Sequence, residues 1–170
     1  MSADVVALLR RALGGRVETS AASREHARAD KSGHAAEGTP LAVVHAASVE
    51  DVQATLRIAS ATRTPVVTRG GATGLAGSAN AGTGEIALSV RSMDRILEVR
   101  SDDLLVVVEP GILNADLDRA LDAQGLWWPP DPASREISTV GGNIATGAGG
   151  LLCAKYGVVR DSVLALDVVL

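Results

Sequence analysis

RGGATGLAGSANAG, residues 69–82, is the most informative stretch of this 170-residue chain. It follows the apolar run Pro65–Thr68, so a short β-branched strand leads directly into a loop with five glycines. Glycine adopts positive φ without steric cost and lets the main chain approach a ligand closely. Successive exposed amides in such a loop form a concave nest that holds anions. The stretch therefore predicts a phosphate-binding loop with Arg69 as an added positive charge, and a tight surface connection is the alternative.

A second glycine-rich stretch, Ser138–Gly150 (STVGGNIATGAGG), repeats this composition. The two stretches together hold ten of the 18 glycines. Two such loops suggest a long ligand with two phosphates that is gripped at several points. The Rossmann spacing GxGxxG and the P-loop pattern GxxxxGK[ST] are both absent, so we expect neither a Rossmann hydride site nor an ATPase.

Composition excludes several functional classes. The net charge of −4 argues against a nucleic-acid partner, whose phosphates demand a basic face. No apolar run approaches the roughly 20 residues that span a bilayer, and the N-terminal residues lack a signal-peptide pattern, so a cytoplasmic protein is expected. Cys153 is the single cysteine, which leaves no thiolate metal site. His26, Asp30 and His34 have helical metal-site spacing, but Gly33 interrupts it, and no metal is expected.

Helical and strand patterns alternate along the chain. Apolar spacing predicts helices over residues 4–13, 48–62 and 113–123, the second capped by Ser48 and the third by Asn114. Strands are expected over residues 41–45, 65–68, 85–89, 96–100, 104–109 and 162–170, with a hairpin turn at 101–103. Residues 16–39 read as a polar, partly irregular lead-in. Such alternation predicts an α/β or α+β fold.

Six motifs together resemble the FAD-binding domain of the vanillyl-alcohol oxidase / p-cresol methylhydroxylase flavoprotein superfamily. They are PVVTRGGATGLAG, VVVEPG, WWPPDPAS, STVGGNIATGAGG, KYGVVRD and LALDVVL. Within that superfamily the sequence is most similar to glycolate oxidase catalytic subunits and D-lactate dehydrogenases. The resemblance implies an α+β, PCMH-type fold of two small α/β lobes with FAD extended between them. It places a helical lead-in at residues 1–39 and the FAD-binding domain at residues 40–170.

The resemblance also implies which residues bind the cofactor. The main pyrophosphate loop is expected to comprise Arg69, Gly70, Gly71, Ala72, Thr73, Gly74, Leu75, Gly77 and Ser78. Further contacts are expected from Pro130, Asp131, Thr139, Gly141, Gly142, Asn143, Ala145 and, through its backbone, Val168. Ala72 and Ala76 stand where the family often has Gly and Ser, and alanine narrows the backbone freedom there. Thr73 occupies the position of the histidine that tethers flavin in some members, so FAD is expected to be held non-covalently.

The implied activity is that of a flavin-dependent oxidoreductase acting on the CH–OH group of a 2-hydroxy acid of the glycolate or D-lactate type. The flavin N5 would take the hydride, and an electron-transfer partner subunit is compatible with this chemistry. No residue of the chain matches the family's catalytic base, so no catalytic residue is assigned. The family's domain continues beyond the final expected strand into a substrate domain, so this chain alone is expected to be inactive and prone to self-association. The alternative is a non-catalytic nucleotide-binding module that acts through a partner chain.

Two other features have competing interpretations. Acid–base chemistry could be suggested by Asp116, Asp118, Arg119 and Asp122, but charges at these spacings are typical of a solvated helix face. Trp127 and Trp128 could stack on a flavin or form a hydrophobic cover over the adjoining prolines.

Overall fold

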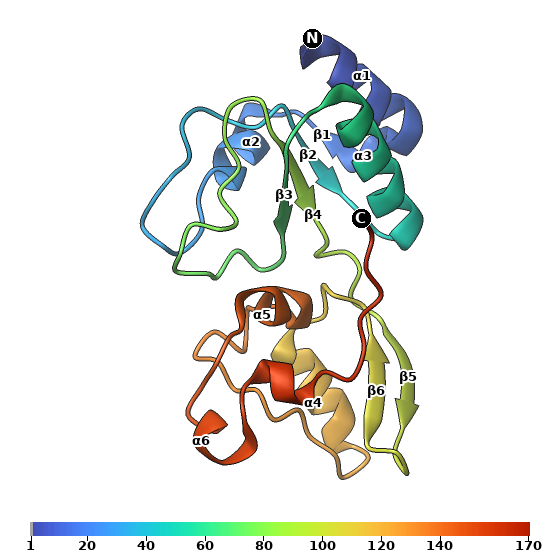
Figure 1. Ribbon diagram of the computed structural model, residues 1–170, viewed down its shortest axis with the longest axis vertical. Helices are drawn as coiled ribbons and strands as arrows, with labels where there is room; N and C mark the ends of the chain where they lie inside the picture. Colours follow the sequence, from blue (N-terminus) through green and yellow to red (C-terminus); the bar gives the residue numbers. More distant parts are fainter. Residues whose placement is uncertain (1) are drawn as a thin grey trace. The chain divides into compact units, whose positions relative to one another are not determined.

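The computed structural model describes residues 2–170. The chain divides into two compact units. The first comprises the residues up to Ser92 together with Val168–Leu170, and the second is Met93–Asp167. Each unit contains both helices and strands (Figure 1), which confirms the expected mixed class.

A four-stranded sheet forms the centre of the first unit. Its strands are β1 (Val17–Glu18), β2 (Ala42–His45), β3 (Val66–Arg69) and β4 (Ile86–Ser89), in the order β1-β2-β4-β3. β2, β4 and β3 are parallel, whereas β1 is antiparallel to β2. Val43 and Val67 both lie opposite Ala87. β4 therefore lies between the two strands of the β–α–β unit that the sequence predicts.

The two faces of this sheet carry side chains of different size. One face presents the fully buried residues Ala42, Val44, Ile86 and Leu88. The other presents Val43, Val67 and Ala87, which pack against Ala27 of α2 (Ala21–Ala27) and against Ala81. Figure 1 shows α2 on one side of the sheet, with α1 (Ser2–Leu13) and α3 (Val49–Thr62) on the other. Because the α2 face is built from small side chains, main-chain atoms can approach the sheet closely there.

Helix α3 begins and ends as the sequence predicts. The Ser48 hydroxyl accepts a hydrogen bond from the Asp51 amide at 3.4 Å, which satisfies one of the amides left free at a helix start. The helix ends at Thr62, and its C-cap residue Arg63 adopts a left-handed conformation with φ 53°. Asp51 is buried, accepts a hydrogen bond from the Ala47 amide and pairs with Arg16. This ion pair links α3 to the short 3₁₀ turn Gly14–Arg16 that follows α1.

The lead-in is more ordered than its composition predicts. Residues 16–39 contain β1, helix α2 and a bridge between Ala29 and Ala35. Ser20 caps α2 by accepting from the Ser23 amide at 3.2 Å. The Ala36 amide also donates to the Arg28 carbonyl at 2.8 Å. The expectation of a partly irregular lead-in holds for the turns and bends over residues 28–39, whereas β1, α2 and the bridge were not predicted by local apolar periodicity.

The second unit combines a hairpin with short helices. Strands β5 (Ile96–Arg100) and β6 (Leu105–Val108) are antiparallel, as predicted, and are joined by a turn in which the Leu104 amide donates to the Ser101 carbonyl. Three helices follow, α4 (Asn114–Asp122), α5 (Val140–Thr146) and α6 (Cys153–Tyr156), then a 3₁₀ turn at Val159–Ser162. The buried core consists of Ile112, Leu117, Leu121 and Val140, with Trp128 and Ile144 packed against it.

Two local predictions in the second half of the chain were wrong. Asn114 does not cap α4; Leu113 is the N-cap residue, without a side-chain bond, and Asn114 is buried one position later. Residues 163–170 form no strand, although they follow an alternating pattern. Most of their apolar side chains are exposed, Leu164 by 79% and Leu166 by 60%. Within the described residues this segment has no partner strand, and an unpaired strand is not stable in water.

Candidate cofactor-binding site

The first glycine stretch connects the end of β3 to β4 as an open loop. Gly77 has φ 76° and Ala72 has φ 51°, so the loop uses the left-handed region at one glycine and at one alanine. Among residues 2–170, no acceptor receives a hydrogen bond from any main-chain amide between Gly70 and Ser78. Leu75, at the tip, is 80% exposed. A run of amides without internal partners is the arrangement that binds phosphate oxygens.

Arg69 does not extend its charge toward this row of amides. Its side chain is 5% exposed, and its guanidinium donates to the carbonyls of Ala27 at 2.6 Å, Ala29 at 3.2 Å, His26 at 3.4 Å and Ala79. Burial lowers the pKa of Arg69, and the nearby Asp30 opposes that shift. The positive charge that was expected to face the phosphates therefore lies inside the first unit, where the guanidinium binds main-chain carbonyls.

The second glycine stretch differs from the first. Its middle is helix α5, and the Thr139 hydroxyl caps it by accepting from the Gly142 amide at 3.1 Å. The Gly141 amide donates to Pro110 and the Val140 amide donates to Ile112, both at 2.9 Å. The amides at the start of α5 are thus already satisfied, so the expectation that this stretch repeats the anion-binding chemistry was wrong.

Asn143 carries an unpaired polar group in this second stretch. The residue is 4% exposed, and its Nδ2 atom has no hydrogen-bond partner among the residues described. Buried polar atoms are rarely left unpaired, since each costs about 1–3 kcal/mol. A donor in this state is a candidate for an interaction with a bound ligand.

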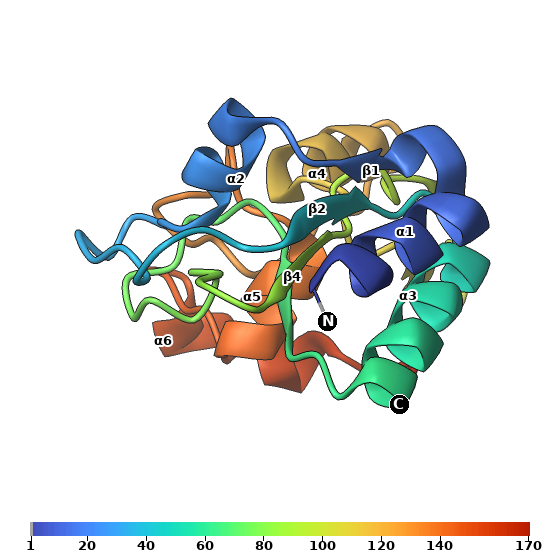
Figure 2. The same ribbon diagram turned by 90° about the horizontal axis from the view of Figure 1, so that it is seen from above.

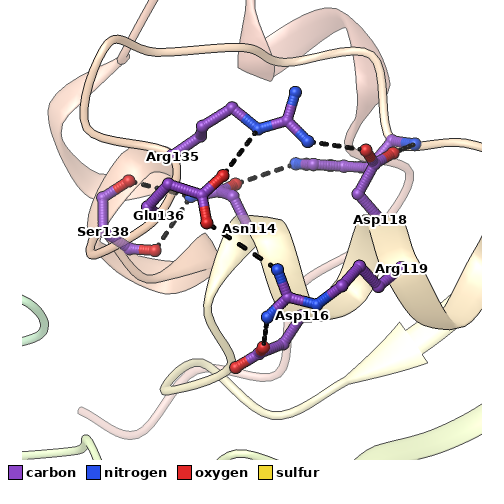
Figure 3. Close-up of polar contacts among 8 residues, drawn as sticks. Asn114, Asp116, Asp118, Arg119, Arg135, Glu136 and Ser138 are labelled. Atoms are coloured by element: carbon purple, nitrogen blue, oxygen red, sulfur yellow. Dashed lines mark hydrogen bonds and ion pairs between the residues drawn. The ribbon is translucent and has the colours of Figure 1, made fainter.

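The segment before α5 is held by hydrogen bonds centred on Asn114, the residue expected to be a helix cap (Figure 3). Asn114 Nδ2 donates to both the carbonyl and the hydroxyl of Ser138 at 3.0 Å, while its Oδ1 accepts from Trp128 Nε1 at 3.0 Å. The asparagine therefore joins α4, the proline-rich segment and the start of the second glycine stretch. Its amide can pair in three directions at once, and no signal in the sequence distinguishes this role from capping.

A charged residue of α4 also holds the segment before α5. Asp118 accepts from the Trp128 amide at 3.0 Å and from Arg135 at 2.8 Å, so it is structural rather than solvated (Figure 3). Arg119 pairs with Asp116 one turn away, as expected for an exposed helix face.

The two tryptophans have different surroundings. Trp128 packs in the core, whereas the Trp127 ring makes an edge contact with the Tyr156 ring, with 4.8 Å between the ring centroids. Trp128 is therefore part of the core.

The remaining predicted residues lie in irregular segments. Pro130 is buried, and Asp131 Oδ1 accepts from the Leu152 amide at 3.0 Å, which anchors the loop before α6. Val168 is 65% exposed in the C-terminal segment of the first unit. His26 and His34 lie beside the first loop and bind it through their carbonyl oxygens. Residues 2–170 contain no group of three or more His, Cys, Asp or Glu arranged to hold a metal, and no helix among them is long and apolar enough to cross a membrane.

The chain belongs to the FAD binding domain family, which it matches over residues 40–170. Among curated proteins, it is 42% identical over 131 residues to the glycolate oxidase subunit GlcD of Bacillus subtilis, an alignment that covers 77% of this chain and 28% of that protein. It is 40% identical over 131 residues to D-lactate dehydrogenase of Anaerostipes hadrus, with 77% and 27% covered. The chain thus spans little more than a quarter of the length of these relatives.

Solved structures show the same fold at lower identity. The chain matches alkyldihydroxyacetonephosphate synthase with a TM-score of 0.85 at 23% identity, over 94% of this chain and 32% of that one. It matches p-cresol methylhydroxylase with a TM-score of 0.72 at 21% identity, over 86% and 29%. The PCMH-type FAD-binding fold and FAD as the cofactor, both expected from the sequence, are confirmed.

Proposed function

We propose that the first glycine loop and the residues around Asn143 bind FAD in a flavin-dependent oxidoreductase that acts on 2-hydroxy acids. The row of unpaired main-chain amides from Gly70 to Ser78 carries the proposal, since a dinucleotide pyrophosphate needs several donors that the protein does not use itself. The curated relatives named for glycolate and D-lactate chemistry support the substrate class. Another relative, from Stutzerimonas stutzeri, is named D-2-hydroxyglutarate dehydrogenase and is 41% identical over 130 residues.

The chain's residues fit the cofactor in two ways. We assign the loop amides of Gly70, Gly71, Ala72, Thr73 and Gly74 to the pyrophosphate. We assign the small residues Thr139, Gly141, Gly142 and Ala145 to other parts of the cofactor, because they surround Asn143, whose Nδ2 donor has no partner among the described residues. Bound FAD would supply a hydride acceptor at its N5. The chain's own contribution is to bind and orient that group.

We assign no catalytic base to this chain. The histidines nearest the first loop use carbonyl oxygens rather than rings in their contacts with it. His45 Nε2 pairs with Glu18 at 3.1 Å on the surface. Removal of the substrate's hydroxyl proton is therefore proposed to depend on residues of a larger protein. The alternative function, a nucleotide-binding module without redox chemistry, binds FAD or a related nucleotide equally well.

FAD titration followed by fluorescence tests the proposal. Gly71→Val places a branched side chain in the row of amides and should abolish FAD retention. Gly15→Val, at a glycine outside the loop where a Cβ would meet no atom within 4 Å, should bind FAD nearly as the parent does. Unchanged affinity in the Gly71→Val variant would remove the loop assignment. Anaerobic addition of glycolate, D-lactate or D-2-hydroxyglutarate to the full-length flavoprotein should then bleach its visible absorption. A flavin that stays oxidised with all three favours the non-redox module.

A further inference from the structure

The most extensive set of contacts that the proposed function does not use lies between the first glycine loop and residues 26–37. These residues, which we call the clamp, run from the end of α2 through the Ala29–Ala35 bridge. They precede the part of the chain that matches the FAD binding domain family. Figures 1 and 2 both show this chain segment beside the loop that joins β3 to β4.

Carbonyl oxygens of the clamp bind the returning half of the loop. The Ala27 carbonyl accepts from the Ala81 amide at 3.0 Å, and the Glu37 carbonyl accepts from the Thr83 amide at 2.9 Å. Asn80 Nδ2 donates to the His34 carbonyl at 3.1 Å. Gly82 lies so close that a Cβ there would be 2.9 Å from the Glu37 carbonyl oxygen. The loop therefore returns to β4 along a path that the clamp defines.

Arg69 connects the clamp to both ends of the loop. It is the last residue of β3, immediately before the unpaired amides, and its buried guanidinium holds three clamp carbonyls together with that of Ala79. The Arg69 side chain thus joins the residue before the row of amides, the Ala79 carbonyl just after the row, and the clamp. A planar guanidinium with five donors suits this role, whereas an ammonium group has three donors and no fixed plane.

Asp30 completes the arrangement near the middle of the loop. Its Oδ1 accepts from the Ser32 amide at 2.9 Å, and its Oδ2 lies 3.8 Å from the position that a Gly74 Cβ would occupy. Burial alone would raise the pKa of Asp30, but hydrogen bonds from Ser32 and the Ala79 amide, with the charge of Arg69, hold it below its ordinary value. The carboxylate stays charged and balances the buried guanidinium.

We propose that the clamp pre-organises the pyrophosphate loop and that Arg69 is a positioning residue for FAD rather than a phosphate ligand. This inference rests on the proposed function for its ligand, but the order of the loop can be measured without any ligand. Pre-organisation matters because a loop that is already shaped loses less conformational entropy when it binds. Residues outside the matched domain then set the affinity for its cofactor.

Four variants test the proposal. Arg69→Met removes the donors, Arg69→Lys restores part of them, and Asn80→Asp replaces the donor facing His34 with a carboxylate oxygen. Arg57→Met, at an exposed arginine of α3 in the same unit, is the matched control. Hydrogen exchange without FAD should be faster over residues 80–83, whose amides are hydrogen-bonded in the parent, in the Arg69→Met and Asn80→Asp variants and unchanged over α1 and α3. FAD affinity should fall about tenfold to a hundredfold with Arg69→Met, about tenfold with Asn80→Asp, and by an intermediate amount with Arg69→Lys.

The outcomes separate the two proposals. If Arg69→Met weakens FAD binding while Asn80→Asp binds as the parent does and loop exchange is unchanged in both, Arg69 is a direct phosphate ligand and the inference is overturned. If the parent binds no FAD, the proposed function fails. The hydrogen-exchange rates of the loop amides in the variants then still test whether the clamp orders the loop. Should Arg69→Met not fold, Asn80→Asp still decides, since parental exchange and affinity in that variant would contradict a clamp.

Discussion

Gly141 lies directly against Pro110. Its amide donates to the Pro110 carbonyl at 2.9 Å, and a Cβ on Gly141 would lie 2.5 Å from the Pro110 Cβ and 2.8 Å from that carbonyl oxygen. The start of α5 is thereby fixed to the segment that follows β6. No side chain of any size fits between the two, so the glycine is required by space rather than by backbone angle.

Gly141→Ala should therefore destabilise the chain by about 1–3 kcal/mol, the usual cost of forcing a methyl group into packed atoms. Gly149→Ala is the control, because a Cβ there would meet only Cys153 Sγ, at an ordinary 3.6 Å. Thermal unfolding without cofactor should give a lower Tm for the first variant and an unchanged or higher Tm for the second. Equal Tm values for the two variants would contradict the packing argument.

Ala72→Gly should leave the chain as stable as the parent or up to about 1.6 kcal/mol more stable. Alanine at φ 51° carries a left-handed penalty of about 1–2 kcal/mol that glycine removes, less about 0.4–1 kcal/mol of added unfolded-state entropy. Ala76→Gly, in the same loop but not at positive φ, should lose about 0.4–1 kcal/mol. Denaturant unfolding of both variants measures the contrast. A loss of stability in Ala72→Gly as large as that in Ala76→Gly would count against the strain at residue 72.

Glu109 should make the second unit sensitive to acid. Hydrogen bonds from the Arg95 side chain hold the pKa of Glu109 below its ordinary 4.5, against the opposing effect of burial. A carboxylate with a lowered folded-state pKa stabilises the fold fully above its unfolded pKa, and this contribution is lost as the pH falls through the folded value. Glu109→Gln should thus lower the Tm by several degrees near pH 7, and the difference from the parent should shrink below about pH 4.5.

The matched control for that experiment lies on the same hairpin. Glu98 pairs with Arg100 at 2.7 Å, but its side chain is 46% exposed, whereas that of Glu109 is 7% exposed. Exposed ion pairs contribute little, so Glu98→Gln should change the Tm only slightly at any pH. Parallel Tm curves for the parent and Glu109→Gln from about pH 7 down to about pH 3 would show that the Glu109 charge does not stabilise the fold.

FAD should leave the protein completely on acid denaturation. The loop residue at the position where some members tether flavin is Thr73, and a threonine hydroxyl offers no nucleophile comparable to imidazole for the flavin 8α carbon. Precipitation of the loaded chain in acid, followed by filtration, should place all yellow colour in the filtrate. Flavin retained in the washed precipitate would show a covalent bond and a nucleophile other than Thr73.

Much of the first unit was predictable because its signals are local. Ser48 with acidic residues behind it marks the start of α3, and short runs of apolar residues mark β2 to β4. The open loop after β3 was also predictable from glycine composition, and its role as an anion-binding nest stays a prediction. In contrast, α2 and the clamp have polar, alanine-rich sequences whose order comes from carbonyls that bind residues 69–83, more than thirty positions away. The apolar periodicity of a sequence does not predict such long-range hydrogen bonds.

The second unit shows the same limit in its side chains. Asn114 has the residue type of a cap and the position of a first helical residue, and only the fold reveals that its amide faces Ser138 and Trp128. In the first unit, Arg69 was expected at the start of the glycine loop, and it is the last residue of β3. The direction of its buried side chain was not predictable, since an arginine beside a glycine-rich loop suggests an outward charge. The strand expected over residues 162–170 depended on a pairing partner, which alternation in one segment cannot supply.

The alanine-lined face of the first sheet limits how this protein can be engineered. Val43, Val67 and Ala87 meet Ala27 and Ala81 there, and filling such a face with larger apolar side chains is a common route to higher thermostability. Here Ala27 belongs to the clamp and Ala81 to the returning glycine loop, so each added methylene would push both away from the sheet. A variant selected for heat resistance at these positions would then bind the cofactor more weakly.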